Sequence, residues 1–141
     1  MTQADCSKTL PDFKSTPGPK RPQATSCRRA SAGRPTAPYR ICRQIAARVA
    51  LDFGVAADDL TSATRGPPRI AFARQVAMYL AHVGLGLSFE AIGRAFGRDR
   101  TTVAHACRTI EDGRDDIWLD CRLATLELIC RAEQRAEAGE R

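Results

Sequence analysis

The stretch Ser88–Arg108, SFEAIGRAFGRDRTTVAHACR, decides the fold of this chain. Apolar residues recur at helical spacing on both sides of Gly97, which predicts two short helices joined by a tight turn at this glycine. The second helix opens with small, β-branched and basic residues, which suit a helix whose N-terminal end lies in the DNA major groove. The stretch therefore predicts a helix-turn-helix and makes the chain a candidate DNA-binding module.

Polar residues mark where these two helices begin. Ser88 and Asp99 are the expected N-caps, because their side-chain oxygens can accept hydrogen bonds from backbone amides of the first turn. The second helix should end at Gly113. Its predicted buried stripe is Val103, Ala106, Cys107 and Ile110, and its opposite face carries Arg100, Thr101, Ala104, His105 and Arg108. That outward face is cationic and has no bulky side chain to hold a groove at a distance.

Three further helices are expected around this centre. Apolar periodicity predicts them over residues 39–53, 69–83 and 115–138. Residues 55–60 are expected to form an acidic turn and residues 61–68 a loop, since two adjacent prolines exclude a helix interior. Gly84 is the expected C-cap of the helix before it. No segment alternates like a strand, so we expect an all-α, five-helix domain over residues 37–138 with the helix-turn-helix at its centre.

The core is expected where apolar residues share a helix face. In the helix 69–83 these residues are Ile70, Ala73, Ala77, Leu80 and Ala81, with Phe72 and Val76 alongside and Met78 and Tyr79 also in the core. In the last helix the expected packing residues are Ile117, Leu119, Cys121, Leu123, Leu126, Ile129 and Cys130.

Cysteine and histidine spacing argues against a metal site. The six cysteines, at positions 6, 27, 42, 107, 121 and 130, form no C-x-x-C pair, and His82 and His105 are not at metal-ligand spacing. Cys42, Cys107, Cys121 and Cys130 fall among apolar helical positions, where free cysteine behaves as a small hydrophobic residue. We therefore expect buried or unreactive thiols and a reducing cytoplasm.

Residues 1–36 have a different composition from the rest of the chain. They are rich in Pro, Ser and Thr and carry seven Lys and Arg against two acidic residues. Such a segment buries too little apolar surface to offset the entropy of ordering, so we expect a disordered basic tail. It is either an arm that adds salt-sensitive DNA affinity or a solvated leader with no dedicated role. No secretory h-region and no membrane span of roughly 18–20 apolar residues is present, which predicts a soluble cytoplasmic protein.

The net charge of +6 is unevenly distributed. Residues 37–63 carry three basic and three acidic residues, whereas residues 64–110 carry seven arginines and two acidic residues. Residues 111–141 reverse this balance, with five arginines and nine acidic residues. A basic patch beside an acidic end favours binding to a polyanion, with the acidic end facing away.

Two segments carry a resemblance to a known family. IAFARQVAMYLAH, followed by LSFEAIGRAFGRDRTTVAHACRTIE, resembles the C-terminal DNA-binding domain of the bacterial replication initiator DnaA. In that family a helix with an Arg-Gln-x-Ala-Met-Tyr-Leu pattern precedes the helix-turn-helix, and a Gly-Arg-Asp-His-Thr-Thr-Val-x-His-Ala signature follows. The resemblance covers about residues 38–112 and is strongest over 69–111. It implies double-stranded DNA as the partner, at replication-origin-like or regulatory sites.

The resemblance also implies roles for individual residues. The residues that match the major-groove signature are Arg98, Asp99, Arg100, Thr101, Thr102, His105 and Arg108. Arg74 matches an arginine that approaches the DNA backbone, and Arg65 or Arg69 is the candidate for a minor-groove arginine in the loop. Ser88 completes the set of candidate DNA-binding residues. For His105 a proton switch and a structural or phosphate-contacting role stay open, and Thr101 and Thr102 can cap the helix as well as contact DNA.

Three departures from the family pattern bear on the DNA sequence that is recognised. The family shows two glycines before the Arg-Asp, whereas this chain has only Gly97. Arg100 replaces the family's histidine, and arginine typically reads the O6 and N7 acceptors of guanine. The loop contains fewer arginines than in the family and is stiffened by Pro67 and Pro68. We expect DNA binding to persist with a target different from the standard initiator box.

The sequence contains no catalytic set. The chain has no G-x-x-x-x-G-K-[ST] phosphate loop, no Ser-His-Asp arrangement and two histidines 23 residues apart. We therefore expect a stand-alone DNA-binding protein that binds no nucleotide or cofactor, has no ATPase activity, and regulates replication initiation or transcription at the nucleoid. The alternative is a protein-interaction module with an initiator-like fold, using the acidic C-terminal helix to bind a partner or itself.

Overall fold

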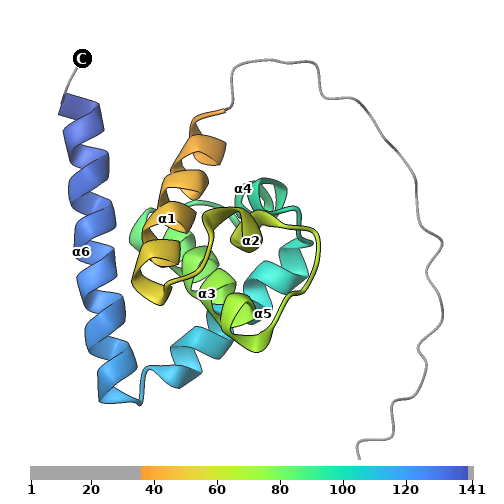
Figure 1. Cartoon of the computed structure of the whole chain (residues 1–141). Helices are drawn as coiled ribbons and strands as arrows, with labels where there is room; N and C mark the ends of the chain where they lie inside the picture. The colour runs from red at the N-terminus through yellow and green to blue at the C-terminus, as the bar shows by residue number, and fades with distance from the viewer. Residues whose placement is uncertain (1–35, 140–141) are drawn as a thin grey trace, which may run out of the picture. The chain divides into compact units, whose positions relative to one another are not determined.

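A computed structural model describes residues 36–139, and over this range the chain contains helices and no strands (Figure 1). The elements are α1 (Ala37–Phe53), α2 (Ala57–Thr61), α3 (Pro68–Tyr79), η1 (Leu80–Gly84), α4 (Phe89–Phe96), α5 (Arg100–Gly113) and α6 (Ile117–Gly139). The predicted all-α class with a central helix-turn-helix, formed by α4 and α5, is confirmed. The predicted disordered tail lies outside the described residues except for Thr36, the N-cap of α1.

The short helix α2 adds a sixth α-helix to the five predicted. Its five residues lie where the sequence indicated an acidic turn. Asp58 and Asp59 occupy its first turn, where acidic side chains interact favourably with the helix dipole, and the fully buried Leu60 anchors it to the core. A helix this short contains too few turns to show an apolar period, which is why the sequence did not reveal it.

The predicted helix 69–83 is continuous, but it ends differently from the expectation. After Tyr79 the helix widens into η1, a π-helical turn that includes Gly84. The left-handed residue is Gly86, at φ +68°, and not Gly84. The amide of Gly86 donates to the carbonyl of His82 at 2.9 Å, and the amide of Leu87 donates to that of Ala81 at 3.1 Å. These two bonds satisfy carbonyls at the end of the helix, so the capping glycine is Gly86, two residues after the predicted Gly84.

The core lies around α3, which packs against α1 and α5, while α1 also packs against α4. The residues expected there, including Ala73, Ala77, Met78 and Tyr79, are buried. The buried stripe predicted for α5 is confirmed as well. Phe72 is the exception, because it is exposed at the edge of α3 with its ring against that of Phe53, at a centroid distance of 5.9 Å.

Only one face of α6 joins this core. Leu123, Leu126 and Cys130 are buried, but Ile117 and Cys121 are exposed, so the prediction that they pack inside was wrong. The seven packing residues predicted for this helix are spread around more of its circumference than the one face that meets α1 and η1. Among residues 36–139, no helix is long and apolar enough to cross a membrane.

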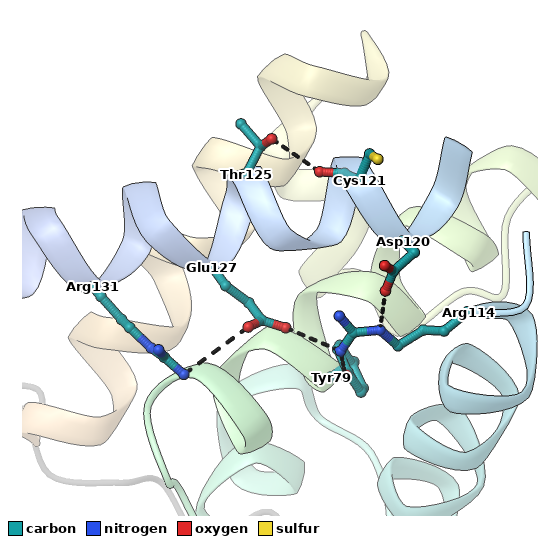
Figure 2. Close-up of polar contacts among 7 residues, drawn as sticks. All are labelled: Tyr79, Arg114, Asp120, Cys121, Thr125, Glu127 and Arg131. Carbon is teal, nitrogen blue, oxygen red and sulfur yellow. Dashed lines mark hydrogen bonds and ion pairs between the residues drawn. The ribbon is translucent and has the colours of Figure 1, made fainter. Parts of the chain in front are cut away.

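A polar cluster fastens the buried face of α6 to the rest of the domain (Figure 2). Arg114, in the turn before α6, donates to the Tyr79 hydroxyl at 2.7 Å and pairs with Asp120 at 2.5 Å. It also lies 3.5 Å from Glu127, whose mostly buried carboxylate has Arg131 at 4.0 Å. The Asp120 carboxylate and the Tyr79 hydroxyl raise the pKa of Arg114, so its guanidinium stays charged.

The remaining three cysteines of the described residues lie on buried helix faces. Cys42, Cys107 and Cys130 are buried free thiols, as expected. Burial raises the pKa of Cys42 and of Cys107 to about 11, and Glu111 contributes at Cys107. These thiols are therefore protonated and unreactive at neutral pH.

Candidate nucleic-acid interface

The turn between α4 and α5 is built on local hydrogen bonds that the sequence predicted. Gly97 ends α4 in the left-handed conformation at φ +61°, which glycine adopts without steric cost. The side chain of Asp99 accepts a hydrogen bond from the Thr101 amide at 3.1 Å, and that of Ser88 accepts one from the Ala91 amide at 3.2 Å. Both predicted N-caps are confirmed.

Gly93 allows the turn to close, and the sequence analysis did not single it out. The Arg98 amide donates to the Gly93 carbonyl at 2.8 Å. A Cβ atom at position 93 would lie 2.6 Å from the Arg98 carbonyl oxygen, closer than two such atoms approach each other. The only sequence signal is a glycine inside a helix, where it costs about 1 kcal/mol and so requires a packing reason.

Arg98 turns back from the helix-turn-helix onto the loop between α2 and α3. Its guanidinium donates to the Ser62 carbonyl at 2.9 Å, to that of Ala63 at 3.0 Å and to that of Thr64 at 3.0 Å. These three bonds use both terminal nitrogens. The side chain therefore links the turn before α5 to a loop more than thirty positions earlier in the chain.

Arg74 holds the same loop from the other side. It is 5% exposed, and its guanidinium donates to four backbone carbonyls. The acceptors are Asp59 at 2.7 Å, Leu60 at 2.8 Å, Thr64 at 3.1 Å and Arg65 at 3.1 Å. Burial, together with the charge of Arg98, lowers the pKa of Arg74. The structure places this arginine under the loop, and its donors are turned inward.

Arg74, Arg98 and residues 59–65 together form what we call the loop clamp. The Thr64 carbonyl accepts from both guanidinium groups, so the two arginines share one acceptor. Carbonyl dipoles here replace the acidic partners that usually accompany a buried guanidinium. The clamp fixes the loop relative to the start of α5.

Of the two candidate minor-groove arginines, the structure favours Arg65. Arg69 donates to the Phe53 carbonyl at 2.6 Å and so satisfies the C-terminal end of α1. The side chain of Arg65 is exposed, and its own carbonyl is held by Arg74. Gly66, at φ +68°, then turns the chain toward α3.

The outward face of α5 is exposed, as the sequence predicted. The exposed residues on it are Arg100, Thr101, Thr102, His105 and Arg108. Within residues 36–139, Arg65, Arg100 and Arg108 have no ion pair with an acidic side chain. The N-terminal end of α5 adds the partial positive charge of a helix dipole. Cations without acidic partners beside a helix N-terminus create a surface suited to phosphate anions.

Neither a metal site nor a deep cavity accompanies this surface. The part of the chain that the structure describes contains no group of three His, Cys, Asp or Glu side chains that could hold a metal ion. The concavity at the turn is open to solvent and is lined by residues of α4 and by Arg98, Asp99 and Arg100.

Comparison with known proteins agrees with this geometry. A model of the bacterial DnaA protein helix-turn-helix matches residues 42–110. This segment is similar to the DnaA helix-turn-helix. The matched range begins within α1 and ends within α5, so it contains the loop clamp, α4 and α5 up to Ile110. In DnaA this helix-turn-helix is a DNA-binding domain used in replication initiation and is not catalytic.

Curated DnaA proteins match about half of the chain. The chromosomal replication initiator protein DnaA of Bifidobacterium animalis subsp. lactis is 46% identical over 69 residues, which are 48% of this chain and 12% of that protein. The DnaA of Brucella abortus biovar 1 is 47% identical over 85 residues, 59% of this chain and 16% of that protein. The chain thus spans 12 to 16% of the length of these relatives.

Two solved structures share the DnaA fold. A DNA replication initiation factor superimposes with a TM-score of 0.62 and 32% identity, over 68% of this chain and 30% of that one. A replication initiator DnaA bound to AMPPCP and single-stranded DNA gives a TM-score of 0.59 and 31% identity, over 67% of this chain and 29% of that one. These matches extend beyond the range of the family model.

Proposed function

We propose that this chain binds double-stranded DNA, with the start of α5 in the major groove and Arg65 directed to the adjacent minor groove. The observation that supports this most is the set of exposed arginines on α5 and the loop without acidic partners among residues 36–139. Phosphates of DNA supply the missing negative charge, and the release of their counterions drives binding.

Within this proposal the site residues divide into contacting and positioning groups. Arg100 reads a guanine, and the proposed additional contacts are Ser88, Asp99, Thr101, Thr102, His105, Arg108 and the exposed part of Arg69. Arg74 and Arg98, which the family resemblance placed at the DNA, act instead through the loop, because their donors are occupied by its carbonyls.

The biological setting of the proposal follows from the DnaA relatives. We propose that the chain acts at origin-like or regulatory sites, in the cytoplasm at the nucleoid, and regulates replication initiation or transcription. It does so without ATPase activity or bound nucleotide. The matched segment is the DNA-binding part of the initiators, which supports a role in selecting a DNA site and not in driving strand separation.

The test is fluorescence anisotropy with a labelled duplex pool and with the corresponding single strands, measured over a range of salt concentrations. Duplex binding should be tighter, and log affinity should fall linearly with log salt concentration. The single-stranded comparison is needed because a related initiator has been solved with single-stranded DNA. Absence of duplex binding at low salt would overturn the proposal. Sequences selected from a random pool would then identify the target.

A second function rests on a different surface. If α5 does not bind duplex DNA, the exposed apolar residues of α6 support a protein-interaction module. The Trp118 side chain is 86% exposed, which is unusual for the largest apolar side chain in a protein. Retention of protein association together with loss of DNA binding would favour this alternative.

A further inference from the structure

The solvent-facing side of α6 carries an apolar stripe that the fold does not use. The stripe consists of Ile117, Trp118, Cys121, Ala124, Leu128 and Ala132, all exposed. Ile117 is 76% exposed and Leu128 is 69% exposed. Figure 1 shows α6 at the edge of the helical domain, and Figure 2 shows Cys121 on the opposite side of the helix from Asp120 and Glu127.

The spacing of this stripe is that of a helix-packing seam. Ile117, Cys121, Ala124 and Leu128 follow one another at intervals of four, three and four residues. This interval pattern places residues along one line of a helix that meets another helix. The small Ala124 at its centre lets a second helix approach closely, and Trp118 lies beside the line.

We propose that the apolar stripe of α6 pairs with the same stripe of a second copy of this chain, with the two helices antiparallel and crossing beside Ala124. A two-fold axis midway between positions 124 and 125 places Leu128 of each helix opposite Cys121 of the other. It also places Ile117 opposite Ala132. Each large side chain then meets a smaller one, so the surface is complementary to itself.

Charge favours the antiparallel direction. Asp115 and Asp116 lie just before α6, and the exposed Arg135 lies near its end, whereas Arg131 is held on the other face by Glu127 and the Gly84 carbonyl. Antiparallel pairing brings each acidic pair beside Arg135 of the other copy, whereas parallel pairing brings like charges together. Because exposed charge pairs contribute little energy, they set the direction while the apolar stripe supplies the affinity.

This pairing is independent of the DNA-binding proposal, because it involves α6 and makes no contact with α5 or the loop clamp. If both hold, one dimer presents two copies of α5 and contacts two half-sites. Oligomeric state measured without DNA therefore tests the pairing alone.

The experiment is sedimentation equilibrium of the full chain and of single variants whose fold is verified by circular dichroism. The wild type should sediment as a dimer and Leu128→Glu as a monomer. Leu51→Glu is the matched control, since Leu51 on α1 is 75% exposed and lies outside the stripe. A monomeric wild type, a dimeric Leu128→Glu variant or a monomeric Leu51→Glu variant would each overturn the proposal.

A charge exchange tests the direction of the helices. Arg135→Asp and Asp115→Arg should each weaken the dimer, and the double variant should restore it to within a few-fold of the wild-type dissociation constant. If the double variant is weaker than both single variants, the antiparallel arrangement is wrong.

Discussion

Arginine has opposite roles at the two ends of this domain. At the loop and the start of α5, guanidinium groups either face solvent or donate to backbone carbonyls, as Arg74 and Arg98 do. At α6, arginines pair with acidic side chains, and five of the six ion pairs among residues 36–139 involve this helix. One end therefore keeps positive charge available for a polyanion, whereas the other neutralises it to attach a helix.

The two ends also differ in how arginine stabilises the fold, through exposed ion pairs at α6 and through buried hydrogen bonds at the loop clamp. The α6 pairs, such as Arg122 with Asp52, are partly exposed, and exposed ion pairs contribute at most about 1 kcal/mol. The loop clamp is buried at Arg74, and each carbonyl that loses its donor there costs more. Substitutions at the two ends should therefore differ in size and in the property they change.

The largest expected effect is that of Arg74→Ala on stability. Removing the guanidinium takes a donor from four carbonyls, of which only that of Thr64 keeps a second donor in Arg98, and leaves a cavity under the loop, so we expect a loss of about 2–4 kcal/mol in the free energy of unfolding. Urea denaturation measures it. Arg122→Ala, the matched change at α6, removes a partly exposed ion pair, a bond to the Asp52 carbonyl and a contact with the Phe53 ring, and should cost about 1 kcal/mol. Equal losses of unfolding free energy for the two variants would contradict the proposed difference in stabilisation between the loop clamp and α6.

Next in size is the effect of Arg100→Ala on DNA recognition. If Arg100 makes a bidentate contact with guanine, its loss should cost about 1–3 kcal/mol on the preferred site and relax the base preference. Competition binding with single-base variants of the selected site measures this. Arg65→Ala should weaken binding more evenly across these sites, and Arg131→Ala on α6 should leave affinity unchanged. A uniform effect of Arg100→Ala on all sequences would identify a phosphate contact instead.

Arg98→Ala should weaken DNA binding without removing a phosphate contact. The loop and the start of α5 lose their link, so affinity should fall several-fold while the slope of log affinity against log salt stays the same. Arg108→Ala, a proposed phosphate contact, should reduce that slope by about 1. A reduced slope for Arg98→Ala would show that this guanidinium leaves the clamp and contacts DNA directly.

The smallest expected effect at neutral pH is that of Cys42, because its contribution to stability changes only at high pH. The pKa of Cys42 is raised by burial to about 11, above its unfolded value of 9.0. Folding therefore favours the neutral thiol, and this contribution is complete below pH 9 and is lost as pH rises toward 11. The urea midpoint should fall over this range, and Cys42→Val should reduce that fall. Cys121→Ser, at an exposed position of α6, should leave it unchanged.

Much of the helix-turn-helix was predictable because its signals are local. The N-caps at Ser88 and Asp99 and the turn at Gly97 depend on neighbouring residues, and all three are confirmed. The roles of Arg74 and Arg98 were not predictable from residue type, since an arginine on a helix or turn is as able to bind carbonyls as phosphates. Only the approach of residues 59–65 decided where these guanidinium groups point.

At the other end of the domain, the sequence by itself determined that α6 forms, but not which of its faces is buried. Helix formation follows from the spacing and propensity of nearby residues, which any window of the sequence contains. Burial depends on neighbours from distant parts of the chain, and α1 and η1 cover only the side that carries Leu123 and Leu126. The tertiary structure alone therefore revealed that Ile117 and Trp118 face solvent, and that two of the arginines in the DNA-binding segment hold its loop.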